Sequence, residues 1–90
     1  MNHHHESQKQ VINRLSRIEG HVRSVKTMVS EGRDCPDVLL QIAAIRKALD
    51  STAKIIFADH LKHCLVHAIQ GEEEDDALEN FQKALDHYIR

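Results

Sequence analysis

The sequence predicts an all-α fold, and three observations lead to that prediction. The chain has 90 residues with only three Gly and one Pro, so few positions interrupt a helix. Its composition is rich in helix-forming Ala, Leu, Glu and Lys. Apolar residues recur at spacings of three and four, the period of a helix with one buried face. We expect one domain over residues 1–90, with a flexible tail at residues 1–7.

The first helix is expected to run from about Glu6 to Val29. Its apolar positions form a heptad seam, typical of a helix that packs against another helix. They are Val11, Leu15, Ile18, Val22, Val25 and Val29. Gly20 lies within this pattern and is interpreted as a point of close approach between helices. Residues 31–34 (Glu-Gly-Arg-Asp) then predict a turn.

The second helix is expected to occupy residues 36–69. This stretch has no internal Gly or Pro after its first residue and is rich in Leu, Ile and Ala. We place Cys35 at the N-cap and Pro36 at the first helical position, which Pro favours. Gly71 is a suitable residue to follow the helix end.

A third helix is expected to begin at Asp75 and Asp76, because carboxylates are favoured at a helix N-terminus. It carries a second heptad seam, formed by Leu78, Phe81, Leu85 and Tyr88. A chain this short buries little core alone, so we expect it to form a homo-oligomer.

The composition also excludes several classes of protein. No apolar run is long enough to cross a membrane, and the N-terminus lacks the apolar core of a signal peptide. We therefore expect a cytoplasmic protein without a membrane partner. In a reducing compartment, the two cysteines indicate thiol or metal chemistry more than a structural disulfide. No Ser-His-Asp order, paired-carboxylate cleft or Gly-rich phosphate loop occurs, so we expect no catalytic residues and no enzyme activity.

Charge is distributed unevenly, although the net charge is only −2. Cations outnumber anions on the first helix, and further cations follow on the second, whereas acidic residues gather at 72–79. A basic face with a remote acidic segment can bind DNA despite a negative total. The candidate DNA contacts are Arg14, Arg17, Arg23, Lys26, Arg46 and Lys47. No helix-turn-helix pattern occurs, so recognition would depend on phosphates and DNA shape.

Cys35, His60 and Cys64 form the main candidate site. A helix N-terminus favours the thiolate of Cys35, a better metal ligand than the thiol. His60 and Cys64, at i and i+4, share one helix face. Along a single helix Cys35 and His60 would lie about 37 Å apart. A second, antiparallel copy would bring them together, giving a symmetric intersubunit site with two sulfur ligands and one nitrogen ligand. Such a site suits Cu(I), Zn(II) or Ni(II).

Other histidines leave alternatives open. His3 and the two histidines after it could complete a metal site, but they could equally be a tail or an expression scar. His63 and His67 lie near the same helix stripe and could each be a further ligand, a hydrogen-bond donor to a ligand or a solvated side chain, and the solvated state is favoured for both. His21, on the first helix, is expected to face solvent or DNA.

Four segments resemble the CsoR/RcnR/FrmR family of bacterial repressors. They are Asn-Arg-Leu-Ser-Arg-Ile-Glu-Gly at 13–20, Asp-Cys-Pro-Asp-Val at 34–38, Gln-Ile-Ala-Ala-Ile-Arg at 41–46 and Asp-His-Leu-Lys-His-Cys at 59–64. The resemblance extends from about residue 9 to residue 69. It implies a three-helix protomer, an antiparallel four-helix-bundle dimer and a dimer of dimers. It also implies binding to double-stranded operator DNA through basic residues of the first two helices, and release of the operator when the inducer binds.

The resemblance leaves the inducer open between three branches of the family. Cys35, His60 and Cys64 match the Cys-His-Cys pattern of the copper-sensing branch, so Cu(I) is favoured. That branch usually has Tyr before the first Cys, whereas Asp34 resembles the persulfide-sensing branch, which would use Cys35 and Cys64. The nickel/cobalt branch uses an N-terminal His, which His3 matches, so Ni(II) or Co(II) is an alternative. A helical oligomerisation or metal-storage module without DNA binding is the remaining alternative.

Overall fold

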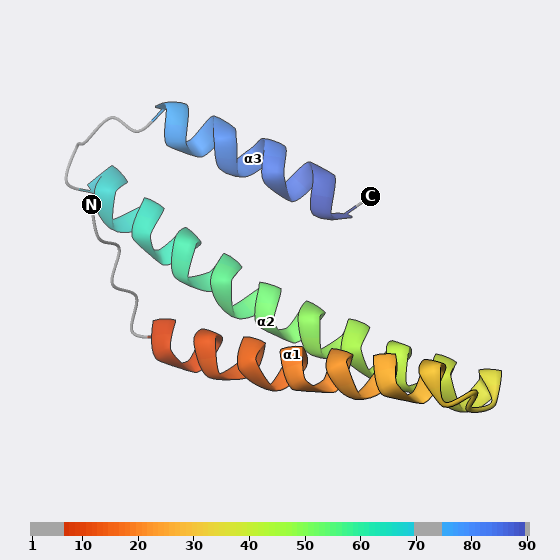
Figure 1. Cartoon of the computed structure of the whole chain (residues 1–90). Helices are drawn as coiled ribbons and strands as arrows, with labels where there is room; N and C mark the ends of the chain where they lie inside the picture. Colours follow the sequence, from red (N-terminus) through yellow and green to blue (C-terminus); the bar gives the residue numbers. More distant parts are fainter. Residues whose placement is uncertain (1–6, 70–74, 90) are drawn as a thin grey trace. The chain divides into compact units, whose positions relative to one another are not determined.

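The computed structural model describes residues 7–69 and 75–89, and within these ranges it contains helices and turns but no strand. The helices are α1 (Gln8–Ser30), α2 (Cys35–Ile69) and α3 (Asp75–Ile89) (Figure 1). The all-α prediction is therefore confirmed, as is the start of the third helix. The chain divides into two compact units, Met1–Asp59 and His60–Arg90. None of the described helices is long and apolar enough to span a membrane.

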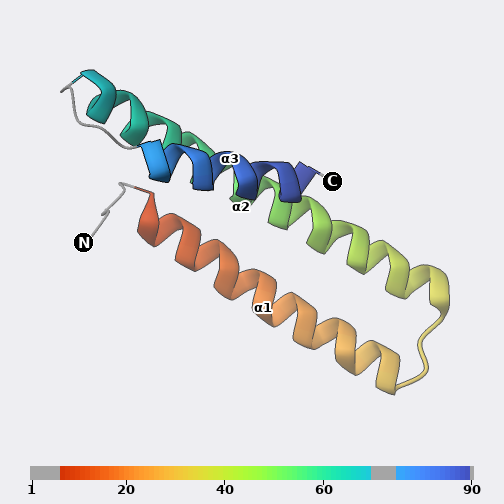
Figure 2. The same ribbon diagram turned by 90° about the horizontal axis from the view of Figure 1, so that it is seen from above.

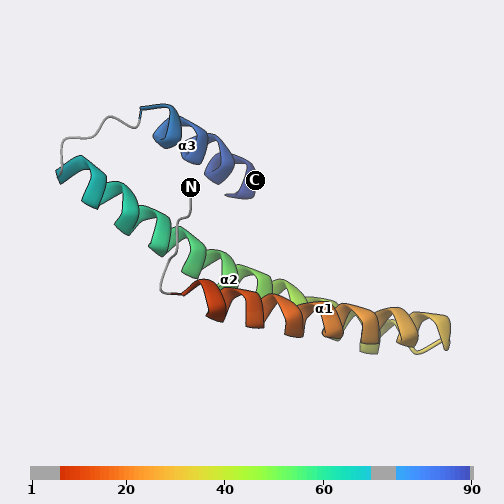
Figure 3. The ribbon, with the colours of Figure 1, turned by 60° about the vertical axis from the view of Figure 1, so that its left-hand side comes forward.

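A tight turn at residues 31–34 reverses the chain after α1, as the sequence predicts. Arg33 N–H donates to Met28 O at 3.0 Å, and Gly32 N–H donates to Val29 O at 3.1 Å. Gly32 has a φ of 75°, which glycine adopts without strain. Together these features form a Schellman motif, which satisfies the last carbonyls of α1. In the first unit, α1 and the adjoining part of α2 consequently lie side by side and antiparallel (Figures 2 and 3).

The beginning of α2 differs by one residue from the prediction. Val38 N–H donates to Asp34 O at 3.1 Å, and the helix begins at Cys35. Asp34 is therefore the N-cap, Cys35 the first helical residue and Pro36 the second. Pro36 is tolerated there because the N–H groups of the first turn have no partner within the helix.

The core of the first unit is small. Ile18 and Val25 of α1 and Ile45 of α2 are each 8% exposed, and Val38 and Ala48 pack against them. A core of this size explains little of the stability that a folded chain needs. Gly20 does not mark a close approach, because a Cβ there would meet nothing within 4 Å among the described atoms. That interpretation is wrong, although α1 does continue through Gly20.

The predicted seam of α1 is in fact two stripes. Ile18 and Val25 face α2, whereas the alternate positions Leu15, Val22 and Val29 remain exposed. A matching exposed stripe on α2 consists of Ile42, Leu49 and Ile56. Leu15 stands three residues before Ile18, and Val22 stands four residues after it. Ile42 and Leu49 have the same positions relative to Ile45. In antiparallel helices equal offsets lie on the same side of the core. We call these six residues the apolar flank.

Candidate metal site and nucleic-acid interface

Cys35 is exposed and carries a free thiol at the first position of α2. The first N–H groups of α2, next to Cys35, have no acceptor within the helix. Arg33 and Asp37 form an ion pair at 3.9 Å beside it, with both side chains about half exposed. Cys35 is thus accessible to a metal ion, an oxidant or a second chain.

His60 belongs to the second unit and is half-buried. Its ring stacks on Phe81 of α3, with ring centroids 4.2 Å apart and an interplanar angle of 25°. This contact restrains the orientation of the imidazole. His63 is half-buried as well, which is contrary to the solvated side chain expected for it.

Several predicted ligands lie outside the described residues. The side chains of Cys64 and His67 are not among those described, although both residues belong to α2. His3 also lies outside the described ranges.

The described part of one chain does not assemble a metal site. Within it, no three His, Cys, Asp or Glu side chains gather closely enough to hold a metal ion. Cys35 and His60 stand about seven turns apart on the same helix. The donor types nevertheless fit a soft or borderline metal, since thiolate and imidazole are the ligands that such ions select.

The six predicted DNA contacts all lie in the first unit, but they do not form one surface. Arg14 is half-buried and the other five are exposed. Arg14 and Arg17 line a hollow between α1 and α2. Arg23 follows Arg14 by about two and a half helical turns and therefore points to nearly the opposite side of α1. The single basic face predicted for α1 is thus divided in two.

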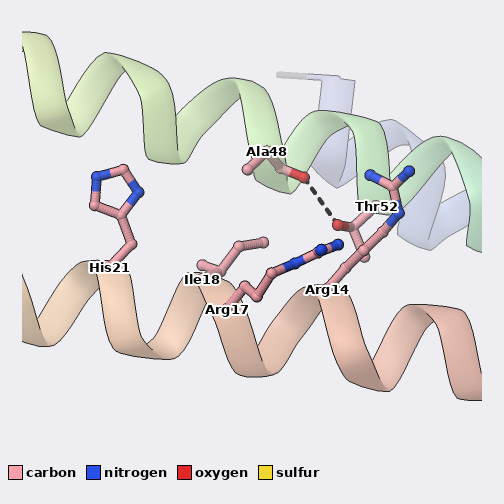
Figure 4. Close-up of a pocket in the computed structure, with 6 residues that line it drawn as sticks. All are labelled: Arg14, Arg17, Ile18, His21, Ala48 and Thr52. Carbon is pink, nitrogen blue, oxygen red and sulfur yellow. Dashed lines mark hydrogen bonds between the residues drawn. The ribbon is translucent and has the colours of Figure 1, made fainter.

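The hollow has a volume of about 120 Å³ and is open to solvent. Its walls are formed by Arg14, Arg17, Ile18, His21, Ala48 and Thr52 (Figure 4). Both arginine side chains extend from α1 towards α2 on the side of Thr52. Thr52 is 2% exposed, and its hydroxyl donates to Ala48 O at 2.8 Å. Arg14 stands four residues before Ile18, and His21 stands three residues after it. Both therefore lie on the other side of the core from the apolar flank. We call this side the cationic flank.

His21 joins the two helices at the hollow, a contact that the sequence did not predict. Its Nε2 lies 2.7 Å from Gln41 Oε1, and both residues are half-buried. His21 therefore faces α2 as well as the hollow, rather than simply solvent or DNA. The spacing of residues 14, 17 and 21, which places them on one helix face, was the available signal.

Comparison with known proteins defines the family. The family model described as "Metal-sensitive transcriptional repressor" matches residues 7–87, nearly the whole chain. This chain belongs to that family. It is accordingly a regulatory protein of a metal-sensing transcriptional repressor family.

Individual members differ in the metal they sense. The chain is 39% identical over 79 residues to the copper-sensing transcriptional repressor CsoR of Bacillus subtilis, covering 87% of this chain and 78% of the relative. A solved structure of the copper-sensing operon regulator protein CsoRGz is 77% identical, with a TM-score of 0.60 over 63% of this chain and 95% of that one. The nickel-responsive transcriptional regulator InrS is 46% identical, with a TM-score of 0.78 over 98% and 99% of the two chains. Membership alone therefore leaves the metal open.

Proposed function

We propose that this protein is a Cu(I)-responsive repressor, which binds operator DNA and releases it when Cu(I) binds. The observation that carries this proposal is the donor set, two thiols and one imidazole on a helix whose first residue, Cys35, is exposed. Three soft or borderline donors suffice for Cu(I), whereas Ni(II) and Co(II) favour more nitrogen and oxygen ligands. The similarity to two copper-sensing proteins supports the same metal.

The proposed site lies between two subunits. Cys35 of one chain would join His60 of the partner subunit and Cys64 of the partner subunit, and symmetry would repeat the site. The apolar flank supports this assembly, because its exposed Leu, Ile and Val side chains need a cover that the described chain does not provide. A second antiparallel hairpin would cover it as a four-helix bundle, and two such dimers would form the tetramer.

A nickel-sensing function is the second candidate, supported by the similarity to InrS over nearly the whole of both chains. In that case His3 would add a nitrogen ligand and Ni(II) or Co(II) would be the inducer. Zn(II) is compatible with the same donors.

Release of a labelled operator fragment tests the proposal and separates its alternatives. Cu(I), Ni(II), Co(II), Zn(II) and a polysulfide are added separately to the protein–DNA complex, with thiols kept reduced in the metal trials. We expect Cu(I) to weaken operator binding about 5- to 150-fold, the usual range of allosteric coupling. Release by Ni(II) that requires His3, with no response to Cu(I), would replace copper by nickel. Release by polysulfide alone, with a Cys35–Cys64 crosslink between chains, would identify a persulfide sensor.

Mixing two inactive variants tests the intersubunit site. Cys35→Ala and Cys64→Ala protomers each lack one ligand in every site as homo-oligomers. A mixed dimer regains one complete site, because one interface combines the intact Cys35 of one chain with the intact His60 and Cys64 of the other. We expect Cu(I) binding to return on mixing, measured by competition with a Cu(I) chelator. If mixing restores no binding, the site is not shared between subunits.

A further inference from the structure

Helix α3 is held in the second unit by one partly buried face. Among its side chains that the structure describes, at residues 79–89, Phe81 and Leu85 are half-buried and the others are exposed. These two residues are four positions apart and therefore share one face of the helix. Because α3 has only 15 residues, it is marginally stable in water without tertiary packing. Its folding thus depends on the contacts that this face makes.

Phe81 makes one of these contacts with His60 of α2. The two ring centroids lie 4.2 Å apart and the ring planes are inclined by 25°, so the rings are stacked. Both side chains are half-buried, and both belong to the second unit. An aromatic side chain of α3 is consequently docked on the residue that the proposed function makes a metal ligand.

The stack restrains the plane of the imidazole. A histidine ring turns about its Cβ–Cγ bond over a broad range of angles when nothing packs against it, and the lone pair that binds a metal ion lies in the ring plane. A ring held flat against Phe81 keeps this lone pair in one plane. A ligand that is already restrained loses less conformational freedom on binding, and for one side chain this is worth about 3- to 10-fold in affinity.

Metal binding in turn strengthens the stack. When His60 donates its lone pair, its ring becomes more positive. The face of an aromatic ring such as that of Phe81 is negative, and it attracts positive groups. The stack is therefore more favourable for a coordinating imidazole than for a free one, so it holds α3 in its docked position more firmly.

We propose that Phe81 is a positioning residue for the metal ligand His60, and that metal binding and the docking of α3 strengthen each other through this stack. The proposal rests on the proposed function in taking His60 as a ligand, for Cu(I) and Ni(II) alike. By thermodynamic linkage, the factor by which docking of α3 raises metal affinity equals the factor by which the metal stabilises the docked helix. A Phe81 that only fills space would show no such link.

The first experiment measures the Cu(I) affinity of the full-length protein by competition with a chelator. We expect Phe81→Leu to weaken binding about 3- to 10-fold, because Leu keeps an apolar side chain but loses the stack. Phe81→Tyr, which keeps the ring, and Tyr88→Leu, the same change at a residue that is 55% exposed, should stay within about twofold of the wild type. Circular dichroism checks that every variant keeps its helix content.

A double-mutant cycle with His60→Ala separates positioning from packing. The two thiols retain some Cu(I) binding in that background, and Phe81→Leu should cause no further loss there, since its effect passes through His60. An equal loss in both backgrounds, or unchanged affinity of Phe81→Leu in a protein that binds Cu(I), overturns this proposal alone. If the wild type binds neither Cu(I) nor Ni(II), the proposed function fails and this proposal with it.

The second experiment measures the reciprocal effect on α3 by hydrogen exchange. We expect saturating Cu(I) to slow exchange of the α3 amides about 3- to 10-fold in the wild type. In Phe81→Leu and in His60→Ala the change should be less than about twofold, because the stack is absent from both. Equal slowing in the wild type and Phe81→Leu, or none in the wild type, overturns the link between the metal and α3.

Discussion

The two flanks of the α1–α2 hairpin have opposite chemistry although they are built by the same rule. Positions three before and four after Ile18 and Ile45 are apolar and exposed, and they form the apolar flank. Positions four before and three after the same residues include Arg14, His21 and Ala48, and they form the cationic flank. A shift of one residue along either helix therefore moves a side chain from one flank to the other. On the apolar flank it faces an expected partner subunit, and on the cationic flank it faces an expected ligand. The exposed apolar flank and the small core are both expected if, as proposed, the hairpin is half of a larger bundle.

The largest effect is expected from a charge on the apolar flank. Leu49→Glu would place a carboxylate where a partner helix is expected, and burying an unpaired charge costs several kcal/mol. We expect the oligomer to dissociate and the thermal midpoint to fall, measured by analytical ultracentrifugation and by circular dichroism.

Leu40→Glu is the matched control for that variant. It makes the same change on the same helix, at a residue that is 68% exposed and points away from the flank. We expect Leu40→Glu to keep the native sedimentation coefficient. Dissociation of both variants, or of neither, would remove the distinction between the flanks.

A smaller effect is expected from the residue between the flanks. Ile45→Ala removes buried methyl groups from the core, and such changes cost about 2–4 kcal/mol. Urea unfolding at a fixed protein concentration measures the free energy of unfolding. Ile12→Ala, at a residue that is 54% exposed, should cost less than about 1 kcal/mol. Equal losses in the two variants would contradict the core assignment.

The smallest effect in free energy is expected on the cationic flank. Arg14→Ala and Arg17→Ala should each weaken operator binding and lower its salt dependence by about one unit of slope, as the loss of one phosphate contact predicts. Mobility shifts at several salt concentrations measure both quantities, and Cu(I) affinity should be retained. Arg33→Ala serves as the control, because Arg33 is paired with Asp37 outside the hollow. An unchanged slope in both variants would move the DNA-binding surface elsewhere.

Local sequence signals predicted most of the fold. The absence of Gly and Pro from the long stretch after Pro36 predicted α2, and Gly32 marked the turn because only glycine adopts its φ easily. These features depend on residues close together in the chain, so their pattern is legible without a structure. The position of the α2 N-cap was wrong by one residue, since the cap depends on which carbonyl accepts the Val38 N–H.

The candidate site was less predictable. Cys35 and His60 were selected by residue type and spacing, and the structure adds the exposure of the thiol and the Phe81 stack. The His21–Gln41 contact and the hollow were missed, because they join residues from two helices whose rotation about their axes is set by packing. The opposite orientation of Arg23 was missed because charge was counted along α1 without regard to its angular position.

The sequence by itself determined that three helices form, where the chain turns and which donor atoms are present, because propensity, turn chemistry and residue type act locally. It also determined the heptad period of α1. Only the tertiary structure decided which residues of this apolar repeat contact α2. Ile18 and Val25 are buried against α2, whereas Leu15 and Val22 are left exposed. A heptad seam is wide enough to contact two neighbours, and the position of the second helix determines which half each neighbour covers.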